Sequence, residues 1–514
     1  MRRRFGTALG VAILAGVVAG AAAYAVRDGE RVVATADEPR PTTTTTSTLP
    51  PTTTTTVASA TTTTTEALRP TGAVPGSTVG EPWGTTRGIT MFRGNPTRTF
   101  YGSGPLPDDP PAVAWTYPAR AMCGSSVVGG VSSQWCGTGW TGQPVVWERP
   151  DGVTEVIFGA YDKAVHFVDA FTGEDTRQPF GVGDIIKGSV TLDPDGYPLL
   201  YFGGRDNTLR VVALDREPVE ELWSLDASAV NGMWNNDWDG NPVIVDDYLY
   251  EGGENSWFFV IRLNRGTGVD GRVTVEPRVA FSMPGWTDEL VARLGRNMSI
   301  ESSVAAFDRR VYFTNSGGRV VGIDLDLALA GEDDPVVFDY WVGDDVDASP
   351  VVDEDGMLYV AVEYERGNER SREVGQLVKL DPYSVGDPRL WGVEVLPEGS
   401  GDGGIWATPA LGFGHVYVPT HTGRLLAVDA QTGEVVWEDA VGFHAWSSAA
   451  VVDDSLVVAT CEAGELRRYS LADPASPELM WSIPAAPGCV ESTPAIWNGT
   501  IYVGSRDGFL RAYR

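Results

Sequence analysis

The stretch Ala427-Val428-Asp429-Ala430-Gln431-Thr432-Gly433-Glu434-Val435-Val436-Trp437 decides the fold of this chain. It contains an alternating strand that ends at an Asp, a Thr-Gly turn, and a second strand that ends in Trp. Alternation of apolar and polar residues is typical of a half-buried β-strand, and Thr-Gly supplies the turn between two such strands. The stretch therefore predicts an antiparallel pair of strands.

The same unit repeats along the chain. Before this stretch come the small pair Ala407-Thr408, then Pro409, and then the short strand His415-Val416-Tyr417-Val418-Pro419. The residue that follows the small pair marks eight copies, namely Pro144, Val190, Pro242, Val304, Pro350, Pro409, Ala449 and Pro494. Successive markers lie 40 to 62 residues apart. Four strands per copy at this spacing indicate a β-propeller.

The two ends of the repeat region complement each other. The eighth copy stops at Tyr513 without its Trp strand, and Val113-Ala114-Trp115-Thr116-Tyr117-Pro118 parallels the Trp strand of the seventh copy, Leu479-Met480-Trp481-Ser482-Ile483-Pro484. An unpaired sheet edge invites aggregation, so we expect the N-terminal strand to close the last blade. The prediction is an all-β fold over residues 83–514, an eight-bladed propeller of four-stranded antiparallel blades.

These residues resemble a known family. Asp429, Thr432, Gly433 and Trp437 match the tryptophan-docking motif of the pyrroloquinoline-quinone (PQQ) type propeller repeat, and Phe92-Arg93-Gly94-Asn95-Pro96 resembles the segment that leads into such propellers. A second copy of the motif has Arg177 where the Trp would stand. The resemblance implies the fold and leaves the function open. The family contains quinoprotein dehydrogenases and non-enzymatic propellers such as the lipoprotein of the bacterial outer-membrane barrel-assembly machinery.

The N-terminus predicts the compartment. Arg2–Arg4 precede an uncharged apolar run of 22 residues, Phe5–Val26. This run is long enough to span a bilayer, whereas the apolar core of a signal peptide has only ~7 to 15 residues. We predict a single transmembrane signal anchor over residues 1–27, with the rest of the chain outside the cytoplasm by the positive-inside rule. Ala23-Tyr24-Ala25 also fits a cleavage site, and cleavage would make the protein secreted.

A low-complexity stretch follows the anchor. Residues 28–82 contain three runs of five threonines separated by Pro and small residues. Such a tract has no apolar face to bury, so we predict a disordered Thr/Pro-rich linker. The whole chain has 514 residues and a net charge of −31. Because nucleic-acid affinity depends on clustered Lys and Arg, this charge excludes nucleic acid as a partner.

One face of the predicted ring gathers candidate binding residues. In an up-and-down blade, the loop that enters the inner strand and the loop between the second and third strands open on the same side, which we call the funnel face. These loops carry the candidate ligand residues Lys187, Trp238, Asp239, Glu301, Asp347, Trp406, His421, Trp446, Glu491 and Arg506. A concave site with aromatic and convergent polar groups is the usual form of a binding site. In related quinoproteins a planar cofactor stacks on an aromatic floor here.

The four cysteines also fall on this face. Cys461 and Cys489 lie in funnel-face loops of adjacent blades, and Cys123 and Cys136 bracket a Gly- and Ser-rich excursion. Of three connectivities we choose Cys123 with Cys136 and Cys461 with Cys489, as suits an oxidising compartment.

Two further patterns concern a metal site and a helix. Asn235, Asp237 and Asp239 are spaced like the start of a calcium loop, but Pro242 and a strand replace the helix that should follow. The spacing alone carries this hypothesis of a metal site. Residues 287–296 (TDELVARLGR) predict one amphipathic helix over the funnel face.

The leading functional hypothesis is a membrane-anchored extracytoplasmic propeller that binds an envelope or cell-surface protein, or a small molecule. The alternative is a PQQ-dependent oxidoreductase that binds PQQ and calcium. Such enzymes usually carry two adjacent cysteines stacked on PQQ, and this chain has no adjacent pair. A sugar-binding propeller is a third hypothesis, suggested by Trp406 and Trp446 beside carboxylates.

Overall fold

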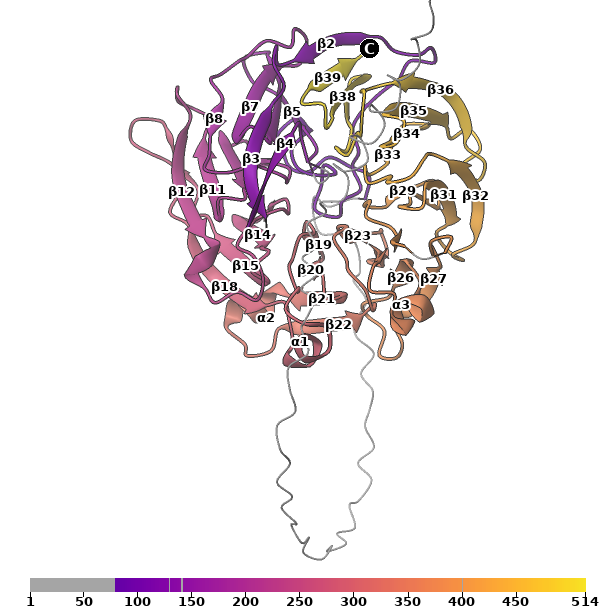
Figure 1. Cartoon of the computed structure of the whole chain (residues 1–514). Helices are drawn as coiled ribbons and strands as arrows, with labels where there is room; N and C mark the ends of the chain where they lie inside the picture. Colours follow the sequence, from indigo (N-terminus) through magenta and orange to yellow (C-terminus); the bar gives the residue numbers. More distant parts are fainter. Residues whose placement is uncertain (1–78, 129, 140–141, 400) are drawn as a thin grey trace, which may run out of the picture. The chain divides into compact units, whose positions relative to one another are not determined.

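The computed structural model describes residues 79–128, 130–139, 142–399 and 401–514. The predicted anchor and all but the last residues of the predicted linker lie outside these residues. Within them, eight four-stranded antiparallel blades surround one centre, as Figure 1 shows. The part of the chain that the structure describes has no helix long and apolar enough to cross a membrane.

The first four blades follow one another along the chain. Blade 1 contains β5 (Val145–Glu148), β6 (Thr154–Ala160), β7 (Ala164–Asp169) and β8 (Phe180–Gly181). Blade 2 contains β9 (Thr191–Leu192), β10 (Leu199–Gly203), β11 (Thr208–Ala213) and β12 (Glu220–Asp226). Blade 3 contains β13 (Val243–Val245), β14 (Tyr248–Gly252), β15 (Trp257–Arg262) and β18 (Arg278–Pro284). Blade 4 contains β19 (Ala305–Phe307), β20 (Arg310–Thr314), β21 (Arg319–Asp324) and β22 (Val336–Trp341).

The last four blades complete the ring. Blade 5 contains β23 (Val351–Val352), β24 (Leu358–Ala361), β26 (Leu377–Leu380) and β27 (Arg389–Val393). Blade 6 contains β29 (Ala410–Gly412), β30 (His415–Pro419), β31 (Arg424–Asp429) and β32 (Val435–Ala440). Blade 7 contains β33 (Ala450–Val452), β34 (Ser455–Ala459), β35 (Glu465–Ser470) and β36 (Glu478–Pro484). Blade 8 contains β37 (Ala495–Trp497), β38 (Thr500–Gly504), β39 (Leu510–Tyr513) and β2 (Val113–Tyr117).

Several short elements lie outside the four main strands of the blades. They are β1 (Gly88–Ile89), the pairs β3 (Cys123–Val128) with β4 (Val131–Cys136), β16 (Gly266–Thr267) with β17 (Val273–Thr274) and β25 (Glu363–Tyr364) with β28 (Gly403–Gly404), the 3-10 turn Ala227–Ala229, and helices α1 (Asp288–Leu294), α2 (Leu325–Ala330) and α3 (Glu369–Val374). The predicted helix over residues 287–296 is therefore confirmed as α1, with the Thr287 hydroxyl as its N-terminal cap.

The predicted ring closure is confirmed. Strand β2 pairs antiparallel with β39, so that a strand from the N-terminal side completes the last blade. The indole N–H of Trp115 then donates to the carbonyl oxygen of Ala170 in blade 1, at 3.1 Å. Strand β2 thus covers the edge of β39 that would otherwise be exposed.

Trp strands dock on the turn of the next blade at Trp115 and Trp391. Trp391 donates to the carbonyl oxygen of Ala430 in blade 6, and a Cβ added to Gly433 would lie 2.7 Å from its ring. The turn itself is held by Asp429, whose carboxylate accepts from the backbone N–H and the hydroxyl of Thr432. In blade 1, Arg177 takes the docking role and donates to the carbonyl oxygen of Leu214 in blade 2. Both residue types thus join one blade to the next.

The small pair of each repeat links the blades around the centre. The backbone N–H at the second position of the pair donates to the hydroxyl at the same position of the next blade. Six such bonds join Gln143 to Ser189, Asn241 to Ser303, Ser303 to Ser349, Ser349 to Thr408, Thr408 to Ser448, and Ser448 to Thr493. Only a short side chain can present a hydroxyl this close to a neighbouring backbone, which explains the residue types of the pair.

The segment before β2 fills the centre of the ring on the side away from the funnel face. Arg93, which is fully buried, donates to the carbonyl oxygens of Pro409 and Ala449, at 2.8 and 2.9 Å. Arg98 is buried equally and donates to the carbonyl oxygens of Val304 and Asn241. Figure 1 shows this indigo segment crossing the centre of the ring. We call residues 83–103 the central plug.

Candidate functional site

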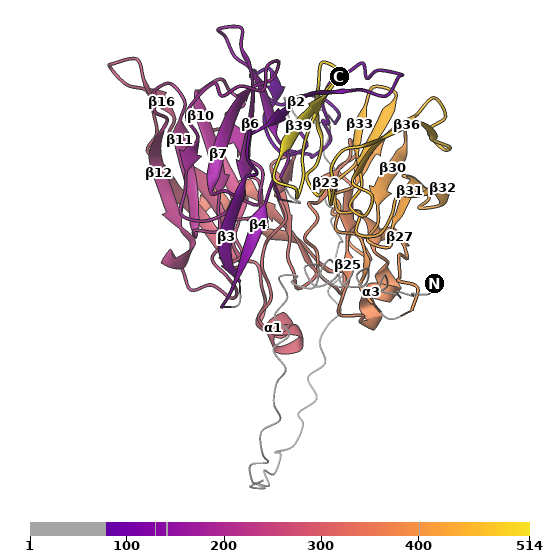
Figure 2. The ribbon, with the colours of Figure 1, turned by 45° about the horizontal axis from the view of Figure 1, so that its top comes forward.

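The funnel face is formed by loops from every blade. Helix α1 lies in the loop that enters β19, and α3 lies between the second and third strands of blade 5. Figure 2 shows both helices on the same side of the ring. The side chains on this face form three clusters, which we describe in turn.

The acidic cluster surrounds one lysine. Lys187 forms an ion pair with Asp239, and its ammonium nitrogen lies 4.0 Å from a carboxyl oxygen of both Glu254 and Glu301. All four residues are buried or nearly so. Beside them, Arg205 pairs with Asp237 at 2.6 Å. The loop that enters each of blades 2 to 4 supplies one member, and Glu254 comes from the turn after β14.

The carboxyl groups of this cluster differ in acidity. Burial raises the pKa of Glu301 to about 7 and the pKa of Asp237 to about 6. Burial and the neighbouring carboxylates also raise the pKa of Glu254 well above its ordinary value. Burial would raise the pKa of Asp239 too, but the Lys187 and Arg205 cations outweigh it and hold that pKa low. The cluster therefore contains one stable ion pair and carboxyl groups that retain a proton near neutral pH.

The acidic cluster does not fit a calcium ion. Asp239, Glu254 and Glu301 bring oxygens within 4.8 Å of one another, but the Lys187 ammonium already contacts this group. A calcium ion here would have to displace this ammonium group and the protons that the raised pKa values of Glu254 and Glu301 favour on their carboxyl groups.

The predicted metal residues bond other side chains of the protein. The amide of Asn235 bonds Glu254, and Asp237 bonds Arg205. Asp246, the twelfth residue of the calcium-like spacing, lies in the turn between β13 and β14, on the opposite face.

The aromatic cluster lies on blades 6 and 7. The rings of Trp406 and His421 are 3.5 Å apart between centroids, and the indole of Trp446 donates to Nδ1 of His421 at 3.0 Å. Phe443 and His444 extend the cluster, with the Phe443 ring 4.9 Å from His421. Trp406 and His421 are buried, while Phe443 is 44% exposed. Phe443 is therefore the most exposed side chain of this cluster.

The arginine cluster lies at the junction of blades 8 and 1. Arg506 pairs with Glu491 at 3.2 Å, and its guanidinium lies over the rings of Trp135 and Tyr161, at 5.0 and 4.9 Å. Such contacts between a cation and ring faces stabilise a partly desolvated guanidinium. Burial raises the pKa of Tyr161, and the charges of Lys187 and Asp239 are close enough to affect it. The arginine and acidic clusters are therefore neighbours.

Two predicted funnel residues do not contact these clusters directly, although the Ser316 and Ser299 hydroxyls link Asp347 to Glu301 of the acidic cluster. Asp347 is mostly buried and accepts from the Ser316 hydroxyl at 3.5 Å. Trp238 is fully buried in the core between blades 2 and 3, where its indole donates to the carbonyl oxygen of Asn207. Its ring is therefore part of the core and is not exposed on the funnel face. The side chains of Asp237 and Asp239, one position before and after it, join the charged cluster instead.

Both predicted disulfides are confirmed. Cys123 pairs with Cys136, and Cys461 pairs with Cys489. The second bond joins the funnel-face loops of blades 7 and 8. Phe443, His444 and Trp135 were missed by the sequence reasoning, although each stands within three residues of a residue that it did select.

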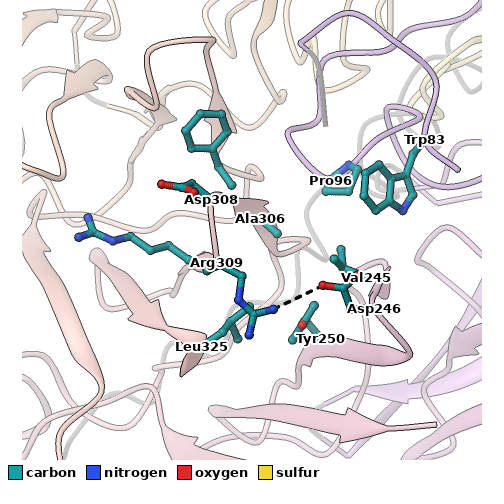
Figure 3. A pocket seen from close by; sticks show the side chains of 11 residues that line it. Trp83, Pro96, Val245, Asp246, Tyr250, Ala306, Asp308, Arg309 and Leu325 are labelled. Atoms are coloured by element: carbon teal, nitrogen blue, oxygen red, sulfur yellow. Dashed lines mark hydrogen bonds and ion pairs between the residues drawn. The ribbon is translucent and has the colours of Figure 1, made fainter. Parts of the chain in front are cut away.

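A separate pocket opens on the opposite face, between blades 3 and 4. Trp83 of the central plug lines it, together with Tyr250 and Leu325, as Figure 3 shows. At its mouth Arg309 pairs with Asp246 at 3.4 Å. The Trp83 indole donates to the carbonyl oxygen of Ile244, so the start of the plug forms part of the pocket wall.

Comparisons with known proteins support the repeat type. Residues 374–514 match the family described as outer membrane protein assembly factor BamB. This range carries PQQ-type propeller repeats. A curated relative, the outer membrane protein assembly factor BamB of Xanthomonas campestris pv. campestris, is 41% identical over 69 residues, which are 13% of this chain and 16% of that protein.

Solved structures share the fold. The quinohemoprotein alcohol dehydrogenase ADHIIG from Pseudomonas putida HK5 aligns with a TM-score of 0.55 and 13% identity, over 83% of this chain and 80% of that one. The quinohemoprotein alcohol dehydrogenase from Comamonas testosteroni aligns with a TM-score of 0.52 and 12% identity, over the same shares. At such identities the likeness shows the propeller fold alone.

Proposed function

We propose that this chain is a membrane-anchored, extracytoplasmic scaffold whose propeller binds an envelope protein through its funnel face. The observation that carries the proposal is the match of residues 374–514 to an outer-membrane assembly factor family. The matched range includes the whole aromatic cluster, from Trp406 to Trp446. The two disulfides favour an oxidising compartment, in agreement with the predicted extracytoplasmic location.

Site-specific photo-crosslinking tests the proposal. A photoreactive amino acid replaces Phe443 on the funnel face, and in a control it replaces Phe413, which is 55% exposed in the turn between β29 and β30 on the opposite face. We expect an envelope protein to be captured from position 443 and not from position 413. Equal capture at both positions, or none at 443, would contradict binding through the funnel face.

The quinoprotein alternative stays a prediction with its own test. Its fold-level support is the likeness to the two dehydrogenases, while the contact between Lys187 and Asp239 opposes a bound calcium ion. Reconstitution with PQQ and calcium, followed by absorbance spectroscopy, should leave no retained cofactor. Retention of PQQ with dye-linked alcohol oxidation would replace the scaffold function by an enzymatic one.

A further inference from the structure

A larger pocket lies on the same face as the Trp83 pocket, but between blades 1 and 2. It has a volume of about 350 Å³, within the ~300–1,000 Å³ range of ligand sites. Its walls are residues 85–87 of the central plug, residues 147–150 at the end of β5, and residues 192, 193, 196 and 197 around the turn between β9 and β10. Because the turn between the two inner strands of a blade lies opposite the funnel-face loops, this pocket is separate from the three funnel clusters.

The carboxylates that line this pocket already have partners within the protein. One oxygen of Glu148 accepts from an indole and an amide of blade 8, and the other pairs with Arg87 at 3.0 Å. Asp193 accepts from the Tyr201 hydroxyl, the Arg265 guanidinium and two backbone N–H groups. The strongest acceptors of the pocket are therefore occupied before any ligand binds.

Two half-buried aromatic side chains give the pocket flat walls and hydrogen-bond donors. They are Trp147 on blade 1 and Tyr197 on blade 2. Each ring has a guanidinium over its face, that of Arg149 at 5.8 Å and that of Arg265 at 5.0 Å, and ion pairs with carboxylates hold both arginines in place. Among the described residues, none bonds the indole N–H of Trp147 or the hydroxyl of Tyr197, so both donors are available to a ligand.

These groups favour a ligand that is apolar and that accepts hydrogen bonds without donating them. Proline-rich segments in the polyproline II conformation dock in aromatic-lined grooves and have no internal hydrogen bonds. Because proline has no backbone N–H, such a segment presents only carbonyl acceptors and apolar rings. A sugar matches the pocket less well, since every sugar hydroxyl also donates and the pocket carboxylates are occupied.

We propose that this pocket binds a proline-rich segment of a partner protein, with the proline rings against Trp147 and Tyr197. The side chains of Asp151 and Asp195, which are 54% and 43% exposed beside the pocket, favour basic residues next to the prolines. Between residues 41 and 68 the linker of this chain contains two adjacent prolines but no Lys or Arg, so we assign the segment to another protein. The site goes beyond the proposed function, because it gives the propeller a second binding face opposite the funnel.

Fluorescence anisotropy of a labelled decaproline peptide with one arginine at each end, titrated with the full chain, tests the site. We expect saturable binding. Trp147→Phe and Tyr197→Phe each keep an aromatic ring and remove one donor, so each should weaken binding about 2- to 10-fold. Tyr248→Phe is the matched control and should leave binding unchanged, because Tyr248 is a half-buried tyrosine in the corresponding hairpin of blade 3, outside the pocket.

The same measurements can overturn the proposal. Since neither donor bonds the protein, both variants should unfold at the urea concentration of the wild type, which separates lost binding from lost folding. No saturable binding, equal binding of a Gly-Ser peptide of the same length, or unchanged affinity in both variants would contradict recognition of prolines at this pocket. Tighter binding of a peptide copied from residues 38–51 would overturn the assignment to a partner protein.

Discussion

At the scale of single residues, the buried carboxyl of Glu301 makes a pH-dependent contribution to stability. Its pKa is raised to about 7, mainly by burial, so the folded state holds a proton between about pH 4.5 and 7 that the unfolded state has released. The wild-type chain therefore loses stability as the pH rises through this window. Glu301→Gln removes this loss and keeps an oxygen that can accept from the Ser299 hydroxyl.

The expected result is a gain of the variant over the wild type that grows with pH. Urea unfolding midpoints at pH 4.5 and 7.5 measure it, as the difference between the two proteins at each pH. A difference that is equal at both pH values would show that folding does not raise the pKa of Glu301.

The hydrogen-bond partners of the buried arginines could not be predicted from the sequence around them. The segment around Arg93 resembles the segment that leads into PQQ-type propellers. The sequence did not predict that it fills the centre of the ring. Its carbonyl partners Pro409 and Ala449 stand 316 and 356 residues away along the chain. Arginine is almost never fully buried unless its charge is compensated, and no local pattern reveals acceptors at such a separation. Trp238 was predicted on the funnel face but lies in the core. Neighbouring residues of one loop can point alternately into the core and toward the central channel.

At the scale of elements, the Thr-Gly turn and the Trp strand form one docking unit. Gly433 has φ +76°, and a Cβ added there would lie 2.7 Å from the Trp391 ring. Gly433→Ala should therefore cost about 1–2 kcal/mol for the left-handed backbone and a further ~1–3 kcal/mol for the clash. Gly414→Ala is the matched control, because Gly414 has φ +74° in the same blade with nothing within 4 Å.

Thermal and urea unfolding of the two variants separate the two costs. Gly414→Ala should show the backbone cost alone, and Gly433→Ala should be less stable than it. Equal destabilisation would mean that the Trp391 ring moves aside freely and that docking adds little to the blade junction.

Element-level patterns were the most predictable part of this protein. The repeat supplied the blade number, the closing strand and the funnel-face loops, because each blade repeats the same local chemistry. In seven blades the outer strand also shifts register by one residue beside the docking position, a bulge that the sequence pattern did not reveal. Such bulges protect an exposed strand edge and turn the docking ring toward the next blade. The grouping of site residues into three clusters depends on side-chain packing between blades, so it could not be predicted.

At the scale of the whole molecule, the central plug is bonded to every blade. Beyond the arginine contacts, its backbone pairs with β5 of blade 1 and accepts from Leu192 of blade 2 and Val352 of blade 5. Gly102 pairs with Ile496 of blade 8. Each blade alone is a small sheet whose inner strand has two to four residues. The plug therefore adds the long-range bonds that hold these inner strands in one ring.

Two truncated chains test this role. A chain that begins at Val79 keeps the plug, whereas one that begins at Gly104 lacks all of it and still contains β2. Charge-assisted hydrogen bonds contribute ~1.5–3 kcal/mol each, and removal of Arg93 and Arg98 leaves several buried carbonyl groups without a donor. We expect the first chain to unfold at the same urea concentration as the full chain, and the second to unfold at a much lower one or to aggregate. The full chain with Arg93→Lys and Arg98→Lys keeps the plug backbone and isolates the arginine contribution, which should lie between the two. If the chain that begins at Gly104 unfolded at the same urea concentration as the one that begins at Val79, the blades would hold together without their central segment.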